Sequence, residues 1–414
     1  MKTFLYTAAA ALMIACSGSP ESQSNNDTKG GNTEAFFSGD FRMELHPNDS
    51  VALPFVMNFG PEVIKIYNGG ETLEATEFKG TDDSLYIDVP VFNSALIVTK
   101  DGDAASGYFT VLDRDDYRID LTGEKGNNQR FKTANANASM DGAWKTQFFR
   151  EGDDGWIAKG TFSQKGSRVT GTFQTNTGDY RFLEGQVSGN DFEIYGFDGI
   201  TSYSFIGTIE GDSLRGNFYS GMTGFYPFAA AKDPSFALDD PNRLTYMLPD
   251  AEEFAFAFPA VNPDLNKATV TSNQSTQTGK VTVIQISGSW CHNCMDETRF
   301  FVDLYDKYNE SGMDVYGICF ERYEDYDKAS SGIQKMIKDL NIPYPMLFAG
   351  KTGAENTKAA LPMINHVMSY PTSIFIDKKG QVRRIHTGFA GPGTQEYDDL
   401  IQETEAFVVE LLNE

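Results

Sequence analysis

The pattern of apolar residues changes near residue 250, and this change divides the chain into two kinds of structure. Between residues 36 and 236, short runs alternate apolar and polar residues and are separated by Gly, Asn and Asp. Such alternation is typical of β-strands joined by tight turns. After residue 250, strand patterns alternate with helical patterns, which predicts an α/β sheet with helices on both faces. The 414 residues are also too many for one ordinary domain.

The β-rich region, residues 36–236, contains a weak internal repeat. Leu183-Glu184 and the residues after it resemble the stretch that begins at Leu73-Glu74, at an offset of about 110 residues. Each half, of about 100 residues, is expected to supply about five strands, with hairpin turns at residues 68–70, 101–102 and 210–212. Together they predict an antiparallel barrel or sandwich. We interpret its aromatic residues as core, and the region as a spacer or docking module.

The N-terminus is typical of a secreted bacterial protein. Residues 1–15 combine Lys2 with an apolar stretch that is too short to span a membrane, which indicates a signal peptide. Residues 12–16, Leu-Met-Ile-Ala-Cys, resemble a lipobox, in which Cys16 is the lipidated residue. The alternative is ordinary signal-peptidase cleavage. The polar residues 16–35 then form a flexible tether, and residues 237–249 a connector to the last domain. We therefore expect a lipid-anchored protein of the periplasm or cell envelope.

The strongest chemical feature is the run Trp-Cys-His-Asn-Cys at residues 290–294, which follows the apolar residues 281–286. This order predicts a strand that delivers two cysteines to the start of a helix. At that position unpaired backbone N–H groups and the helix dipole favour the thiolate form. Two cysteines three residues apart can also close a disulfide, so the pair can alternate between dithiol and disulfide and transfer two electrons.

Charge and residue spacing argue against several other classes of protein. The net charge of −24 and the lack of a basic patch argue against binding of nucleic acid. Cys291, His292 and Cys294 lack the fourth ligand of a zinc site, so we expect no metal, and no cofactor is implied. A peroxiredoxin-like antioxidant enzyme would carry Thr three residues before its cysteine, where this chain has Gly288.

Residues 250–414 resemble the TlpA-like (ResA-like) thiol–disulfide oxidoreductases of the thioredoxin superfamily. The resemblance rests on the motif at 290–294, on Tyr370-Pro371-Thr372 before a strand, and on residues 375–380 with a hairpin after them. It implies an α+β multidomain chain in which an antiparallel β barrel or sandwich precedes an α/β thioredoxin-fold domain. The composition of residues 36–236 resembles that of lipocalin-like domains that precede such domains in some bacterial lipoproteins.

The resemblance assigns roles to the residues of the motif. Cys291 matches the exposed nucleophile, and Cys294 the buried cysteine that resolves the mixed disulfide. Trp290 shields the sulfurs. Pro371 matches a cis-proline that faces the two cysteines, and the neighbouring Tyr370 lines the substrate site.

Three further residues are expected to tune the cysteines. Glu321 matches an acidic residue that can take the proton from Cys294 if burial raises its pKa, and the alternative is a solvated acid. His292 can donate a hydrogen bond toward the Cys291 sulfur. Asn293 stands where the family commonly has Pro, which is expected to loosen the first helical turn. Cys319 is interpreted as a buried, inert thiol.

The function that follows is an envelope thiol–disulfide oxidoreductase, which reduces protein disulfides through a CxxC cycle. The implied partners are disulfide-containing exported proteins, apocytochrome c among them, and a membrane thiol donor that returns the electrons. An alternative from another class is a β-rich binding lipoprotein with a regulatory redox domain. The peroxiredoxin-like enzyme is the remaining alternative.

Overall fold

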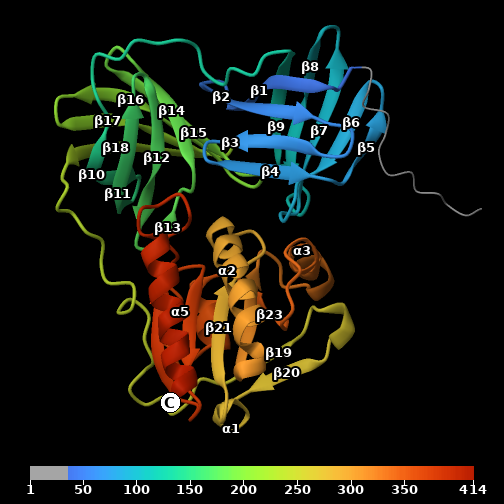
Figure 1. Ribbon diagram of the computed structural model, residues 1–414, viewed down its shortest axis with the longest axis vertical. Helices are drawn as coiled ribbons and strands as arrows, with labels where there is room; N and C mark the ends of the chain where they lie inside the picture. Colours follow the sequence, from blue (N-terminus) through green and yellow to red (C-terminus); the bar gives the residue numbers. More distant parts are fainter. Residues whose placement is uncertain (1–35) are drawn as a thin grey trace, which may run out of the picture.

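The computed structural model describes residues 36–414. The predicted signal peptide (1–15), the tether (16–35) and the lipidation site Cys16 lie outside the described residues. Within residues 36–414, no helix is long and apolar enough to cross a membrane. The described chain is rich in strands, and two strand-rich units lie above the C-terminal domain in Figure 1.

The first unit is a nine-stranded antiparallel sheet in the order β4-β3-β2-β1-β9-β8-β7-β6-β5. Its strands are β1 (Gly39–Asn48), β2 (Val51–Phe59), β3 (Ile64–Asn68), β4 (Glu71–Ala75), β5 (Phe78–Thr81), β6 (Ser84–Asp88), β7 (Ser94–Asp101), β8 (Ala104–Val111) and β9 (Arg118–Lys125). Along β1, Phe41, Met43 and Leu45 are buried while their neighbours are partly exposed. This alternation places one face of the sheet in a core.

The second unit is a closed antiparallel barrel, because β11 pairs with both β10 and β12. Its strands are β10 (Gly142–Arg150), β11 (Asp153–Lys165), β12 (Arg168–Thr175), β13 (Gly178–Asp179), β14 (Leu183–Ser188), β15 (Asp191–Phe197), β16 (Ser202–Glu210), β17 (Ser213–Ser220) and β18 (Gly224–Lys232). Its interior is filled with rings such as Trp144, Phe148 and Phe205. The aromatic residues here are therefore core, as predicted.

Each half of the β-rich region builds its own nine-stranded sheet, so the expectation of about five strands per half was wrong. Several strands, among them β3, β4 and β5, have only four or five residues. Strands this short carry too few alternating positions to be recognised from their pattern.

The C-terminal domain is built on a five-stranded mixed sheet in the order β23-β22-β21-β24-β25, with β21, β22 and β23 parallel. Its strands are β21 (Val281–Ser287), β22 (Met313–Glu321), β23 (Met346–Lys351), β24 (Thr372–Ile376) and β25 (Val382–Thr387), and the hairpin β19 (Phe256–Pro259) and β20 (Thr269–Ser272) precedes them. Its helices are α1 (Gln274–Gln277), α2 (His292–Tyr308), α3 (Tyr326–Asp339), α4 (Ala354–Ala360) and α5 (Tyr397–Asn413), with short 3-10 turns at Pro263–Leu265 and Asn309–Ser311.

Both faces of this sheet are covered. Phe301 of α2, Ile333 of α3 and Leu411 of α5 join one apolar core with alternate residues of the strands. On the opposite face, Phe254 and Leu361, which flank β19 and α4, pack with the other set of strand residues. A sheet buried on both sides explains why every residue of β21 is buried.

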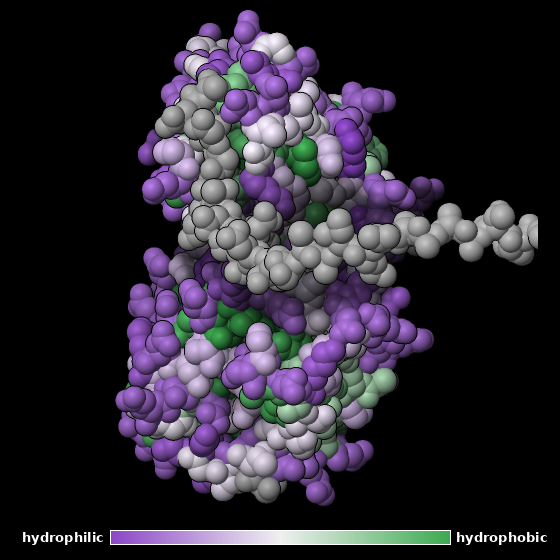
Figure 2. All heavy atoms as spheres, turned by 90° about the vertical axis from the view of Figure 1, so that its right-hand side faces the viewer, coloured by the Kyte–Doolittle hydropathy of each residue, from purple (hydrophilic) through white to green (hydrophobic). Residues whose placement is uncertain are grey.

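The three units are joined by buried polar contacts as well as by apolar packing. Ser94 of the first sheet donates to the Gly199 carbonyl of the barrel at 2.5 Å. The backbone N–H of Val91 donates to Asp339 of α3 at 2.8 Å. In Figure 2, hydrophilic side chains cover most of the visible surface in the upper and the lower part of the molecule, in keeping with the net charge of −24.

Candidate active site

The cysteine pair lies at the N-terminus of α2, directly after β21. Cys291 is the N-cap of the helix, and its sulfur accepts a hydrogen bond from the Cys294 backbone N–H at 3.2 Å. Helix α2 therefore begins at His292, so the cysteines stand at the start of a helix as predicted. A disulfide joins Cys291 and Cys294, which is the oxidised form of the predicted pair. The helix N-terminus favours negative charge on the Cys291 sulfur once the disulfide is reduced.

Both sulfurs lie below the surface. Cys294 is fully buried, as predicted, but Cys291 is only 7% exposed, so the expectation of an exposed nucleophile was wrong. The Cys291 sulfur lies 3.4 Å from the Tyr370 carbonyl oxygen. Trp290 stacks edge-on against the Tyr370 ring and donates from its indole nitrogen to the Phe320 carbonyl at 3.0 Å.

The bond between Tyr370 and Pro371 is cis, as the resemblance implied. The segment around it is held on both sides. The Gly388 backbone N–H donates to the Pro371 carbonyl at 2.9 Å. Just before the proline, the Ser369 hydroxyl donates to the Thr177 carbonyl of the barrel at 2.6 Å. The cis-proline, Tyr370 and the cysteines therefore lie together beneath the turn between β12 and β13.

Glu321 is a buried acid rather than a solvated one. It ends β22 with an exposed fraction of 2%, and its carboxylate accepts from the Ser289 backbone N–H at 2.7 Å and from the Ser289 hydroxyl at 2.8 Å. Burial raises the pKa of Glu321 to about 7, although the hydrogen bonds from Ser289 act in the other direction. Cys319 is fully buried in the same strand, and burial raises the pKa of its thiol.

A second buried acid, Glu297, was missed in the sequence. It is 2% exposed and accepts from the Ser373 hydroxyl at 2.6 Å and from the Gln285 amide at 3.0 Å. The same amide nitrogen of Gln285 donates to the Cys294 carbonyl at 3.2 Å. Burial raises the pKa of Glu297 to about 7. Its position three residues after Cys294, on the same side of α2, was the signal that could have found it.

On the opposite side of the cysteines, His292 meets the barrel. Its Nδ1 lies 3.0 Å from the Asp198 carboxylate, and its ring packs edge-on against Tyr203. The polar contact of this ring is therefore with Asp198, and not with the Cys291 sulfur as expected. A carboxylate only accepts, so Nδ1 carries the hydrogen.

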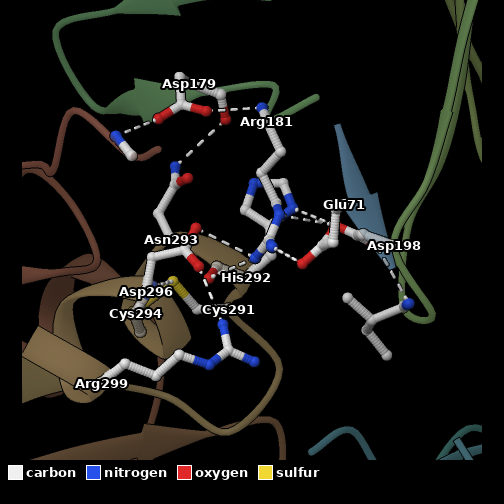
Figure 3. Close-up of polar contacts among 12 residues, drawn as sticks. Glu71, Asp179, Arg181, Asp198, Cys291, His292, Asn293, Cys294, Asp296 and Arg299 are labelled. Carbon is white, nitrogen blue, oxygen red and sulfur yellow. Dashed lines mark hydrogen bonds and ion pairs between the residues drawn. A yellow bond between two sulfur atoms is a disulfide. The ribbon is translucent and has the colours of Figure 1, made fainter. Parts of the chain in front are cut away.

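Arg181 links all three units around this contact, as Figure 3 shows. Its side chain is 4% exposed and forms ion pairs with Asp296 of α2 at 3.1 Å, with Asp198 at 3.8 Å and with Glu71 of the first sheet. Burial acts to lower the pKa of Arg181, but the surrounding carboxylates outweigh it and raise that pKa. The guanidinium therefore stays charged, and its charge offsets that of several buried acids.

A contact with the barrel accounts for Asn293, which stands where the family commonly has proline. Its side-chain amide donates to the Asp179 carbonyl at 3.2 Å, a contact that proline could not make. The adjacent Gly178 has φ of +134°, and a Cβ there would collide with the Asn293 amide. The Asp179 carboxylate accepts from the Gly391 backbone N–H at 2.7 Å, and burial raises the pKa of Asp179 to about 6.

Comparison with known proteins agrees with this geometry. Residues 251–385 match the AhpC/TSA family. ResA, a thiol-disulfide oxidoreductase of Bacillus cereus, is 27% identical over 104 residues, which are 25% of this chain and 53% of ResA. ResA of Geobacillus thermodenitrificans is 23% identical over 128 residues, 31% of this chain and 63% of that protein. The chain thus spans about half the length of the first of these relatives.

Solved structures match the same region. A thioredoxin-family thiol:disulfide interchange protein of Chlorobium tepidum is 16% identical, with a TM-score of 0.30, and covers 40% of this chain and 99% of its own. A secreted thiol-disulfide isomerase of Corynebacterium glutamicum is also 16% identical, with a TM-score of 0.32, covering 44% and 99%. Residues 251–385, which match the family model, lie in the C-terminal domain. We call this domain ResA-like for its sequence similarity to these relatives.

The ResA-like domain supplies the cysteines, the two buried acids and the cis-proline. Asp179, Arg181 and Asp198 come from the barrel, which lies outside the matched residues 251–385. Among residues 36–414, no group of His, Cys, Asp and Glu side chains is arranged to hold a metal ion. The cysteine pair can carry out thiol–disulfide exchange, and the two buried carboxyl groups can accept and return protons.

Proposed function

We propose that this protein is a thiol–disulfide oxidoreductase that reduces disulfides in the bacterial cell envelope. The observation that carries the proposal is the Cys291–Cys294 pair at the N-terminus of α2, with two buried acids beside it whose pKa values are about 7. A carboxyl group with a pKa near the working pH can both accept and return a proton.

In the reducing direction, the Cys291 thiolate attacks a substrate disulfide and forms a mixed disulfide with one substrate sulfur. The other substrate sulfur leaves and takes up a proton. Cys294 then loses its proton and attacks the Cys291 sulfur, which releases the second substrate thiol. Glu297 is connected to the Cys294 backbone through Gln285, and it is the acid we assign to hold that proton, with Glu321 on the adjoining strand.

The cellular setting belongs to the same proposal. Lipidation at Cys16 would hold the protein on a membrane of the envelope, and a membrane thiol donor would return two electrons to the cysteine pair after each cycle. Disulfide-bonded exported proteins, apocytochrome c among them, are the substrates that the resemblance implies. Labelled fatty acid should enter the parent protein and not Cys16→Ala, and labelling of both would remove the lipid anchor from the proposal.

Disulfide exchange in cysteine variants tests the chemistry. Cys291→Ser should lose all reduction of a disulfide substrate, and Cys294→Ser should accumulate mixed disulfides that a mass spectrum identifies. Cys319→Ser is the matched control, because Cys319 is a fully buried free thiol and should leave exchange intact. Equal activity of Cys291→Ser and the parent would contradict the proposal.

A further inference from the structure

A cavity of about 320 Å³ lies over Cys291, in the seam between the barrel and the ResA-like domain. Cys291, Trp290 and Tyr370 line one side of this seam cavity, and Tyr180, Thr201 and Tyr203 of the barrel line the other. Pockets for small molecules typically measure about 300–1,000 Å³, so the seam cavity is at the small end of that range.

The barrel wall of the seam cavity is fixed to the ResA-like domain on both sides of Cys291. On one side, Asp198 holds His292 and the Asp179 carbonyl holds Asn293. On the other side, the Thr177 carbonyl accepts from Ser369. The buried ion pairs of Arg181 add to this attachment. Removing one partner of such a buried pair leaves charge unpaired in a low dielectric, so separation of the two walls is costly.

This attachment limits what can reach the reactive sulfur. Exchange requires a substrate sulfur in direct contact with Cys291, in line with the bond that breaks. The seam cavity opens to solvent, so a folded protein can reach Cys291 only with a segment narrow enough to fit between the two fixed walls. A small molecule whose disulfide carries only short substituents can fit entirely inside the cavity.

The residues that line the seam cavity also determine which substituents on a disulfide it can bind. Thr175, Thr177, Thr201 and Tyr203 line the seam cavity with hydroxyl-bearing side chains. The Thr175 hydroxyl donates to the Gly178 carbonyl and the Thr201 hydroxyl to Asp198, so these two can only accept a further hydrogen bond. The Arg322 guanidinium adds a positive group at the edge, 3.6 Å from Asp113. Such a lining can form hydrogen bonds and ion pairs with amino and carboxylate groups on the substrate.

We propose that the seam cavity binds low-molecular-weight disulfides with amino-acid arms, of about the size of cystine, and that these are the substrates of the cysteine pair. The inference rests on the proposed oxidoreductase function, and it replaces exported proteins with small molecules as the substrate class. The barrel is then one wall of the substrate site, and not only a spacer.

The chemical step balances without a further group. The Cys291 thiolate attacks one sulfur of the small disulfide, the S–S bond of the substrate breaks, and one thiolate leaves and is protonated. Cys294 then displaces the second thiol from Cys291. The substrate gains two electrons, the cysteine pair loses two and closes its disulfide, and an external dithiol reductant reopens it.

The experiment uses the full chain, reduced in advance and freed of reductant. Its oxidation is followed in a single turnover with cystine and with insulin, at equal concentrations of disulfide. Each rate is divided by the rate of dithiothreitol with the same disulfide, which removes the intrinsic reactivity of the substrate. We expect the normalised rate with cystine to exceed that with insulin at least tenfold. An equal or faster normalised rate with insulin would overturn the proposal.

A cavity-filling variant sharpens the test. Thr177→Trp adds a large side chain at an exposed position that lines the seam cavity, and it should lower the cystine rate at least tenfold. Thr170→Trp, at an exposed position of β12 away from the seam cavity, is the control and should keep the parent rate. An unchanged cystine rate in a folded Thr177→Trp protein would also overturn the proposal. Should Thr177→Trp fail to fold, the comparison of substrates on the parent still decides.

The two proposals fail in different ways. If the parent oxidises with neither cystine nor insulin, the proposed function itself is wrong. If insulin reacts at least as fast as cystine and Cys291→Ser abolishes that reaction, oxidoreductase function stands and the small-molecule substrate class falls.

Discussion

The two sides of the cysteine pair are built on different electrostatic principles. On the inner side, Glu297 and Glu321 of the ResA-like domain are buried with neutral hydrogen-bond donors, and burial raises both pKa values to about 7. On the outer side, Asp198 is just as buried but faces Arg181 and His292. Burial acts to raise the pKa of Asp198, and these neighbours outweigh it and hold that pKa below its usual range.

The difference separates proton transfer from attachment. An acid that titrates near neutrality can exchange a proton during a reaction cycle. An acid that stays ionised against a buried arginine holds two parts of a protein together, and loses stability when its partner is removed. Variants on each side should therefore change different measurements.

The largest expected effect is on the outer side. Arg181→Met removes the buried cation that Glu71, Asp198 and Asp296 share, and leaves Asp296 with Arg299 and Asp198 with His292 as their remaining partners. The free energy of unfolding should fall by about 3–5 kcal/mol. Urea unfolding followed by tryptophan fluorescence measures it. The control is Lys159→Met, which removes an ion pair between the barrel and Glu396 whose partners are 21% and 40% exposed. That change should cost about 0–1 kcal/mol. An equal loss of unfolding free energy in the two variants would show that Arg181 contributes no more to stability than a partly exposed ion pair does.

On the inner side, Glu321→Gln should change how stability depends on pH. The pKa of Glu321 is raised from 4.5 to about 7, so between these values the folded protein keeps a proton that the unfolded chain releases. Its contribution to the free energy of unfolding is therefore full below about pH 4.5 and is lost as pH rises through 7. The loss is about 3 kcal/mol, from 1.4 kcal/mol per pKa unit.

The measurement is urea unfolding at pH 5 and pH 8. Glu321→Gln should lose about 2–3 kcal/mol less than the parent over this interval, because the amide does not titrate and part of the parent's loss has already occurred at pH 5. Glu297 is present in both proteins, so its own contribution cancels in the comparison. Glu324→Gln, at an exposed position three residues away, should behave as the parent. A parent and a Glu321→Gln protein with parallel pH curves would contradict the raised pKa.

The inner side was largely predictable from the sequence and the outer side was not. The strand and the cysteines lie in local patterns, while the cis-proline and Glu321 were implied by the family resemblance and Glu297 was missed. Hairpin turns such as Asp101–Gly102 were marked by a glycine that the structure places at φ of +63°. Asp198 and His292 are 94 residues apart, and Arg181 and Glu71 are 110 apart. Residues so far apart in the sequence share no local pattern, because they come into contact only when separate sheets pack together. The low exposure of Cys291 was missed as well.

A smaller effect is expected for Asp198→Asn. The change removes one negative charge from the neighbourhood of the cysteines, which favours the Cys291 thiolate and so the reduced form. The reduction potential of the pair should become less negative by about 10–30 mV, where 30 mV corresponds to a tenfold change in the equilibrium constant. Equilibration with glutathione buffers measures it. Asp212→Asn, at an exposed position between β16 and β17, is the control and should not shift the potential. A more negative potential in Asp198→Asn would show that the carboxylate acts mainly through His292.

The smallest effect is expected for Ser369→Ala, which is compared with the loss of a hydroxyl on the other side of the cysteines. Ser369→Ala removes the hydrogen bond to the Thr177 carbonyl, and because Thr177 is exposed, water can replace the hydroxyl. The free energy of unfolding should fall by about 0.5–1 kcal/mol. Ser373→Ala removes the donor to Glu297 in the closed interior, where no solvent replaces it, and should cost about 1–3 kcal/mol. Both variants shorten a serine by one oxygen, so the difference between them in urea unfolding measures access of water to the two sides. A larger loss for Ser369→Ala would place the drier environment at the seam with the barrel, and would reverse the comparison.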